Sequence, residues 1–555
     1  MRSRSGSILV PVFLFLTFAF LYAIWLPHSY SGDDLQQAAA IAEQSTGIVF
    51  YHPEGGRLYE PGLTDVPDPA SMQIAVNPRY LLERPTMVGA ARLWHALSGQ
   101  NDVLGPILAL RILAGSLGIV FFYLGVQRLW NSVSIALIAA TGLGITLTYW
   151  VYSTHVDQSI TMVAMVCIAF YMLVRYSQTR QLRDKLLVIG FLSVATFYNF
   201  TAVFTTAAFA LGTAALERQW TGSSLPQLIQ RAVGFGLIYA AVVLGAILLA
   251  VALLAGPERL ADSTYWSGVL FAGKPEYNIA LVQDVLRGVL ALGKSLVVFP
   301  GVSGSLQAFW DSAGTGERVL LLTYYGVVLT FMSLAVLLLY LARRGHGRPV
   351  FSWLWVTLGL TFVFHTLFNL FWDPGFIKYW LLPLWAWWLA VAAMLASASS
   401  QQKNWVRVLR FGTAAFVTAI FTLNFVFVFL PESRPESNPW VEIAQEVGRE
   451  TSPNSLFISL SHPLDFHITY FAHRNLLSIG LLTYAGRGAE IDEVLGLQVA
   501  RHLADDGEVY VISDQHDTLA AIAERLNQIS GPIETEAVWS YPHQVTIYRV
   551  IFPGT

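Results

Sequence analysis

Cysteine and charge are both scarce in this sequence. Cys167 is the only cysteine among 555 residues, which excludes an intramolecular disulfide and a cysteine metal site. Charged residues make up 12% of the chain, roughly half of what a soluble protein carries. The net charge of −3 argues against a nucleic-acid partner, because phosphate-binding surfaces concentrate Lys and Arg.

The sequence is rich in long apolar segments instead. Hydrophobic residues make up 55% of the chain, and the mean hydropathy is +0.53. Many apolar runs approach the ~20 residues that a helix needs to cross a bilayer. The composition therefore predicts a polytopic α-helical membrane protein.

The first apolar run covers residues 8–26 and has no small-x-small cleavage site, so we interpret it as a retained span. Arg2 and Arg4 precede it and predict a cytoplasmic N-terminus. Asp33 and Asp34 then follow on the outer side.

Further spans are predicted at roughly 104–127, 134–152, 159–176, 187–199, 201–216, 232–255, 319–341, 351–371, 378–397 and 410–430. The basic residues of alternate loops, Arg344 and Arg407 among them, agree with about eleven spans and an outward C-terminus. The short pair within 187–216 can also be counted as one span, which would invert the topology of everything after it.

Two long outer loops and one soluble domain complete the predicted layout. Loop 31–103 contains an amphipathic helix over 81–97 that suits a membrane interface. Loop 256–318 contains a marginal apolar run at 285–300, a re-entrant or interfacial helix. The predicted domains are a membrane domain, 1–430, and an extracytoplasmic α/β domain, 431–555.

The soluble domain is predicted from alternating helix and strand patterns. Helices are predicted at 441–450, 491–504 and 518–529, and strands at 456–460, 509–513 and 544–550. No glycine-rich phosphate motif is present in its loops. Docking, acceptor recognition and stabilisation all remain open as its role.

Polar side chains collect at the predicted outer ends of spans. They are Asp33 and Asp34 after the first span, His155 and Asp157 after the third, Lys378 between two late spans, and Arg79 in the first loop. Ionisable groups at the edge of a membrane are functional candidates, because burial without a partner is costly.

Each of these residues also has a structural interpretation. The acidic pair can open a helix as an N-cap, and His155 and Asp157 can simply mark the end of a span. Lys378 can be a snorkelling anchor. Arg79 can pair with Glu83, four residues further on, and for Arg79 this is the favoured interpretation.

The layout resembles the GT-C superfamily of membrane glycosyltransferases, and within it the protein-mannosyltransferase and aminoarabinose-transferase-like branch. The resemblance covers about residues 8–430. It is carried by the acidic pair after the first span, an Asn77-Pro78-Arg79 entry to the interfacial helix, Thr154-His155-Val156-Asp157, and Lys378-Tyr-Trp-Leu-Leu-Pro-Leu. One departure is that Asn77-Pro78-Arg79 stands where the superfamily often has His-Pro-Pro.

The resemblance implies a transferase that uses a polyprenyl-phosphate-linked sugar at the outer face of the membrane, with inversion at the anomeric carbon. Asp33 is then the expected base for the acceptor hydroxyl, with Asp34 beside it. Positive charge for the leaving phosphate is expected from Lys378, Arg79, or a divalent cation (Mg²⁺ or Mn²⁺) held by Asp157 and His155.

The implied partners are the polyprenyl-phosphate sugar, a protein, lipid or glycan acceptor, and membrane lipid, in a bacterial inner or plasma membrane and its cell envelope. The competing function is a transporter or flippase, in which buried ionisable groups relay protons or ions. Against it, the charges lie on one side of the membrane and no inverted repeat is evident.

Overall fold

The computed structural model describes residues 6–26, 81–261, 281–299, 312–344, 352–399, 404–434 and 438–553, apart from short interruptions, together with single positions in 35–45 and at 263. The chain forms two compact units. Of the described residues, the first unit holds α1, the start of α3 and Gly105–Ser433; the second holds the rest of α3 up to Leu104 and everything from Arg434.

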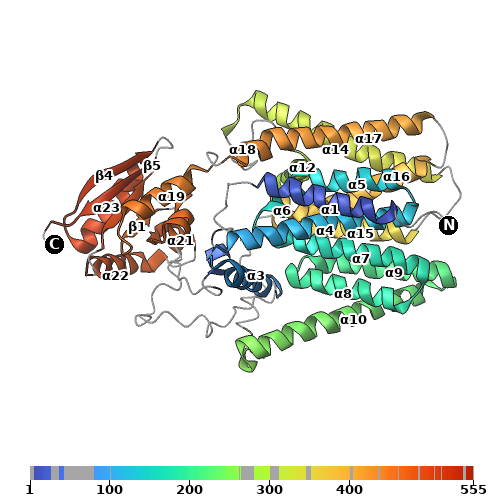
Figure 1. The fold of residues 1–555 in the computed structure, drawn as a ribbon, viewed down its shortest axis with the longest axis horizontal. Helices are drawn as coiled ribbons and strands as arrows, with labels where there is room; N and C mark the ends of the chain where they lie inside the picture. The colour runs from blue at the N-terminus through green and yellow to red at the C-terminus, as the bar shows by residue number, and fades with distance from the viewer. Residues whose placement is uncertain are drawn as a thin grey trace. The chain divides into compact units, whose positions relative to one another are not determined.

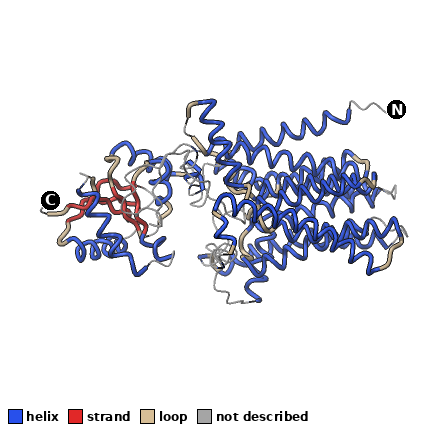
Figure 2. The backbone as a smooth tube through the Cα atoms, turned by 90° about the horizontal axis from the view of Figure 1, so that it is seen from below, coloured by secondary structure: helices blue, strands red, loops and turns tan. Residues whose placement is uncertain are grey.

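The first unit is built of helices that run side by side (Figures 1 and 2). Its long helices are α1 (Gly6–Ile24), α4 (Leu104–Trp130), α7 (Ser159–Thr179), α8 (Leu182–Tyr198), α9 (Ala202–Thr221), α10 (Leu225–Ala250), α14 (Thr315–Arg344), α15 (Ser352–Trp372), α16 (Leu381–Ser399) and α17 (Asn404–Asn424). Shorter elements are α5 (Val133–Ile145), α6 (Leu147–Thr154), η2 (Val251–Ala255), η3 (Pro257–Leu260), α12 (Leu281–Leu296), η4 (Ile377–Trp380), η5 (Phe425–Phe429) and α18 (Leu430–Glu432).

Six helices within the described residues are long and apolar enough to cross a membrane. They are Leu104–Trp130, Ser159–Thr179, Leu225–Leu253, Ser352–Trp372, Ile377–Ala398 and Arg407–Glu432. The pair α5 and α6, bent by 64°, makes a seventh when it is counted as one span. The chain is therefore a multi-pass membrane protein, and the expected count of eleven is not confirmed.

One predicted span is broken in the structure, and the alternative left open for residues 187–216 is decided. The run at 134–152 is broken at Thr146, whose backbone leaves helical geometry and whose hydroxyl donates to the carbonyl of Leu143 at 2.8 Å. The short pair within 187–216 forms two separate helices, α8 and α9, because Asn199 ends α8 in an extended conformation. The alternative of one long span over 187–216 is wrong.

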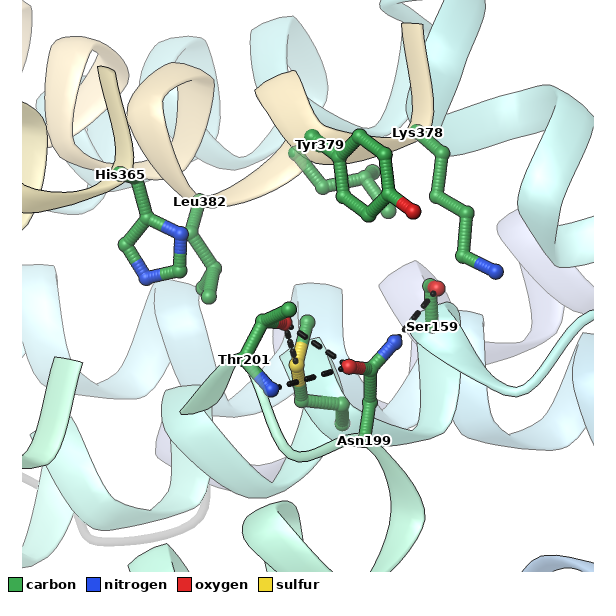
Figure 3. Close-up of a pocket in the computed structure, with 9 residues that line it drawn as sticks. Ser159, Asn199, Thr201, His365, Lys378, Tyr379 and Leu382 are labelled. Atoms are coloured by element: carbon green, nitrogen blue, oxygen red, sulfur yellow. Dashed lines mark hydrogen bonds between the residues drawn. The ribbon is translucent and has the colours of Figure 1, made fainter. Parts of the chain in front are cut away.

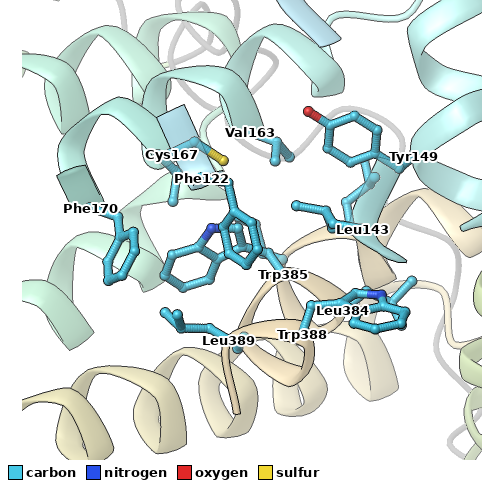
Figure 4. Packing of buried hydrophobic residues seen from close by; sticks show 14 of the residues in the cluster. Phe122, Leu143, Tyr149, Val163, Cys167, Phe170, Leu384, Trp385, Trp388 and Leu389 are labelled. Atoms are coloured by element: carbon cyan, nitrogen blue, oxygen red, sulfur yellow. The ribbon is translucent and has the colours of Figure 1, made fainter. Parts of the chain in front are cut away.

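The core of the first unit is aromatic. Trp385 of α16 packs edge-on against Phe122 of α4 and Phe170 of α7 (Figure 4). Trp388, one turn further along, lies directly over Gly142 of α5, where any Cβ would collide with its ring. These fully buried rings fix α16 against α4, α5 and α7, the last of which leads out of the turn at 155–158.

The predicted interfacial helix is confirmed as a helix, α3 (Glu83–Ser98). The marginal run at 285–300 forms α12, which is strongly amphipathic and packs against α6, η4 and α14. Asn424 of α17 holds the end of α12, since its side-chain oxygen accepts the Val298 N–H at 2.9 Å.

The described part of the second unit contains a C-terminal domain with a five-stranded sheet in the order β2-β1-β3-β5-β4. Its strands are β1 (Leu456–Ser459), β2 (Asn475–Ser478), β3 (Val509–Ser513), β4 (Glu534–Tyr541) and β5 (Val545–Ile551). Its helical elements are α19 (Pro439–Glu450), α20 (Leu464–His467), η7 (Ile468–Ala472), α21 (Ile479–Tyr484), η8 (Gly488–Glu490), α22 (Ile491–Ala504) and α23 (His516–Ser530).

This sheet is mixed. Strands β2, β1 and β3 are parallel, with Leu456 opposite both Asn475 and Val509, whereas β3, β5 and β4 are antiparallel. One face packs against α19, α20 and η7, and the other against α21, α22 and α23. The predicted α/β domain is confirmed, with β2 and β4 as strands that the sequence patterns did not predict.

Asp465 gives the C-terminal domain a pH-sensitive core. Burial raises its pKa to about 6, although the hydroxyls of Ser459 and Ser478 and the His462 N–H favour the charged form. A raised carboxyl pKa means that stability is greatest below the unfolded value of 3.8 and is lost as the pH rises through 6.

At pH 8 we expect amide hydrogen exchange in β1 and β2 to be slower in Asp465→Asn than in wild type. The free energy of opening should be higher in the variant by up to about 3 kcal/mol, since each pKa unit corresponds to ~1.4 kcal/mol. The difference should vanish near pH 4, where wild-type Asp465 is protonated. Hydrogen–deuterium exchange of both full-length proteins at the two pH values is the measurement, and an equal difference at both would contradict the assignment.

Candidate functional site

Asp157 and Lys378, 221 positions apart in the chain, form a buried ion pair in the first unit. Lys378 Nζ lies 2.5 Å from Asp157 Oδ2, and the two side chains are only 12% and 15% exposed. Asp157 lies in the turn between α6 and α7, and Lys378 lies in η4 between α15 and α16. The turns at the ends of two helix pairs therefore meet at one point.

The charge on Asp157 is maintained by its partners. Burial alone would raise its pKa, but the Lys378 ammonium and the hydroxyl and backbone N–H of Ser159 outweigh burial, so the pKa lies below its ordinary value. The Ser159 N–H donates to Asp157 Oδ1 at 2.7 Å and helps to start α7. Both carboxylate oxygens are thus engaged.

Local sequence fixes the position of Lys378. The Asp373-Pro374-Gly375 turn ends α15, and the chain re-enters the helical unit through η4. The side-chain amide of Asn369 in α15 donates to the carbonyl of Tyr379 at 2.9 Å. This hydrogen bond ties the residue next to Lys378 back to the preceding helix.

A small cavity lined by both polar and apolar residues lies beside Lys378 (Figure 3). Its lining residues are Ser159, Met162, Asn199, Thr201, His365, Lys378, Tyr379, Leu381 and Leu382. Asn199 organises one wall: its amide group donates to Ser159 Oγ at 3.3 Å, and its oxygen accepts from the Thr201 hydroxyl at 2.9 Å. The buried His365, another lining residue, shares a hydrogen bond of 2.9 Å with Thr205.

Two buried charges near the ion pair were not among the predicted site residues. Glu83 of α3 has Oε1 3.8 Å from Nη2 of Arg111 in α4, and both side chains are largely buried. Burial raises the pKa of Glu83 to about 7, with Asp157 acting in the same direction and Arg111 and Lys378 against it. An arginine inside the apolar run of α4 was the available sequence signal.

His155 is placed differently from Asp157. Its Nδ1 lies 2.8 Å from the carbonyl of Val151, one turn back along α6. No group of three or more His, Cys, Asp or Glu side chains suited to a metal occurs within the described residues. With both oxygens of Asp157 already engaged, these two residues do not fit a metal site by themselves.

Asp33, Asp34 and Arg79 lie outside the described residues, as does the expected pairing of Arg79 with Glu83. The helix before the acidic pair, α1, is described. Tyr22 of α1 donates to the Gly144 carbonyl at 2.7 Å, and its ring contacts Trp150 of α6. Thus α1 packs beside α6, which leads into the turn that carries Asp157.

Comparisons with known proteins agree with this layout. Residues 84–246 match the family model described as dolichyl-phosphate-mannose-protein mannosyltransferase. No curated protein sequence matches the chain.

Among solved structures, the chain is similar to ArnT from Cupriavidus metallidurans. It is 12% identical to the form bound to undecaprenyl phosphate, over 99% of this chain and 98% of that one, with a TM-score of 0.56. The apo form gives 12% identity, 98% of each chain and a TM-score of 0.56. The Pmt1–Pmt2 protein O-mannosyltransferase complex of S. cerevisiae, bound to its sugar donor, is 14% identical over 48% of this chain and 35% of that one, but its TM-score of 0.30 is too low to support an argument.

The likeness to ArnT extends over nearly the whole chain, so it includes the C-terminal sheet domain as well as the helices. The chain therefore has the fold of the GT-C membrane glycosyltransferases, and it resembles their mannosyltransferase branch in sequence over residues 84–246.

Proposed function

We propose that this protein is a membrane glycosyltransferase that moves a sugar from a polyprenyl-phosphate-linked donor to an acceptor at the outer face of the membrane. The observation that carries the proposal is the buried Asp157–Lys378 pair, which lies where two helix-connecting turns meet in a GT-C fold. A lysine held at such a point supplies charge for a leaving phosphate, and the surrounding apolar helices suit a lipid tail.

The proposed reaction transfers one proton, forms one bond and breaks one bond. Asp33 takes the proton of the acceptor hydroxyl, with Asp34 as its neighbour. The hydroxyl oxygen attacks the anomeric carbon, and the bond from that carbon to the phosphate oxygen breaks. The electron pair leaves with the polyprenyl phosphate, whose charge Lys378 and Arg79 balance.

The proposed setting is a bacterial inner or plasma membrane, with the N-terminus cytoplasmic and the C-terminal domain extracytoplasmic. The sugar can be a hexose or a pentose, and the acceptor a protein, a lipid or a glycan. That the fold neighbour ArnT was solved with undecaprenyl phosphate supports a polyprenyl phosphate as the carrier.

Proteoliposomes that contain the purified protein and a polyprenyl phosphate carrying a radiolabelled sugar test the proposal. A transferase releases free polyprenyl phosphate and moves the label to an added membrane-extract acceptor. A transporter or flippase, the competing function, moves the labelled lipid across the bilayer and leaves the bond between sugar and phosphate intact. Transbilayer movement without release would overturn the proposal.

A divalent cation at Asp157 and His155 remains a separate proposal from the sequence. Because these residues do not fit a metal by themselves, we derive no step through one. We accordingly expect transfer to stay within about twofold of its starting rate after treatment with EDTA. Loss of activity that Mg²⁺ or Mn²⁺ restores would instead support the cation.

A further inference from the structure

Arg111 is a buried cation to which the proposed reaction assigns no role. It lies in α4 within the apolar stretch 107–114, and its side chain is 3% exposed. A guanidinium in such a place is costly unless its N–H groups are satisfied. What satisfies them indicates what Arg111 does.

The guanidinium hydrogen-bonds to the chain on both sides of Asp157, in the turn between α6 and α7 and at the start of α7. Nε and Nη2 both donate to the carbonyl of Val156, at 3.2 and 3.0 Å. Nη1 donates to the Thr161 hydroxyl at 2.8 Å, in the first turn of α7. A planar fork holds two such acceptors in a fixed relation, which a lysine ammonium cannot reproduce.

The same side chain also reaches α3. Nη2 lies 3.6 Å from the Met87 sulfur and 3.8 Å from Glu83 Oε1. One guanidinium therefore contacts α3, the turn at 155–158 and the start of α7. The hydrogen bonds to Val156 and Thr161 lie on either side of Asp157 in the chain, so they give Arg111 a hold on the turn that carries Asp157.

We propose that Arg111 is a positioning residue: by clamping the Val156 carbonyl and the Thr161 hydroxyl, it sets where Asp157 meets Lys378. A bound reacting group that is misplaced by about 1 Å can cost about 100-fold in rate, so a clamp on the adjacent peptide has a functional consequence. Only this rate consequence rests on the proposed glycosyltransferase function; the clamp itself does not.

Thiol alkylation tests the clamp without any assay of activity. Val156→Cys, in a Cys167→Ala background, places a thiol at a fully buried position of the turn. Added Arg111→Gln or Arg111→Lys should raise its alkylation rate by at least about tenfold, since hydrogen bonds from a charged group are lost. Thr161→Val, which leaves both bonds to Val156, should raise it by about threefold or less.

The matched control is Arg128→Lys. Arg128 lies in the same helix but is exposed and bonds to Gln178 at 2.7 Å, so its replacement should leave the alkylation rate unchanged. If Arg111→Lys, which preserves the charge and is the variant expected to fold, alkylates at the parent rate, the clamp is wrong. If every variant, Arg128→Lys included, accelerates equally, the effect is general loosening and the clamp is again wrong.

Kinetics then test the consequence for the site. In the transferase assay, Arg111→Lys should lower kcat by about 10- to 100-fold while KM for the donor lipid changes by less than about threefold. A raised KM with unchanged kcat would assign Arg111 to donor binding and overturn the positioning role. Absence of transferase activity in the wild type would overturn the proposed function, while the alkylation result would still decide the clamp.

Discussion

Asp33→Asn is expected to lower sugar transfer by about 10²- to 10⁴-fold, the usual contribution of a positioned general base. The amide has almost the shape of the carboxylate but cannot accept the proton of the acceptor hydroxyl. The variant should still insert, fold and bind undecaprenyl phosphate, because the carboxylate is proposed to act on the acceptor and not on the donor phosphate. Initial rates of transfer at saturating donor are the measurement.

Two comparisons sharpen that result. Asp34→Asn should lose less than Asp33→Asn, since Asp34 is proposed only to be the neighbour of the base. Asp102→Asn is a matched control, because Asp102 is another loop carboxylate and accepts the Leu104 N–H at 3.0 Å at the start of α4. It should keep most of the activity. Full activity in Asp33→Asn would remove that residue from the mechanism.

The layout of this protein was predictable from its sequence because it depends on composition and periodicity. Apolar length predicted the spans, and short runs of apolar, β-branched and aromatic residues predicted β1, β3 and β5. Strand β4 was missed because Glu534–Tyr541 is an exposed edge strand with polar residues along it. Strand β2, with the sequence Asn-Leu-Leu-Ser, has two leucines between polar ends and no β-branched or aromatic residue, so no strand pattern stands out.

The candidate site was predictable only in part. The sequence placed Asp157 and Lys378 on one side of the membrane, but it gave them different roles and could not show that they pair across 221 positions. Pairing at such a distance is decided by tertiary packing, here by aromatic contacts such as that of Trp385 with Phe170. Arg111 carried a sequence signal, an isolated charge within an apolar run, but it lies away from the span ends where the other polar residues collect.

The ion pair itself permits a test that separates stability from function. Removing one partner of a buried pair leaves the other charge uncompensated and costs about 3–5 kcal/mol, whereas replacing both is often nearly neutral. Lys378→Met and Asp157→Asn should therefore each lower the thermal stability of the purified protein. The double variant should recover most of that loss.

Activity should not follow stability in this series. If Lys378 balances the charge of the leaving phosphate, Lys378→Met and the double variant should both lose about 10²- to 10³-fold in kcat, the usual effect of removing one such electrostatic group. Lys185→Met is the control, because Lys185 forms a comparably buried pair with Glu217 at 2.8 Å in the same unit, with side chains 18% and 12% exposed. Arg231 lies 3.8 Å from the same carboxylate, so the loss of stability should be smaller than for Lys378→Met. The control variant should keep its kcat despite that loss. If the double variant recovers transfer together with stability, the Asp157–Lys378 pair is structural, and the positive charge that a leaving phosphate needs must come from another residue.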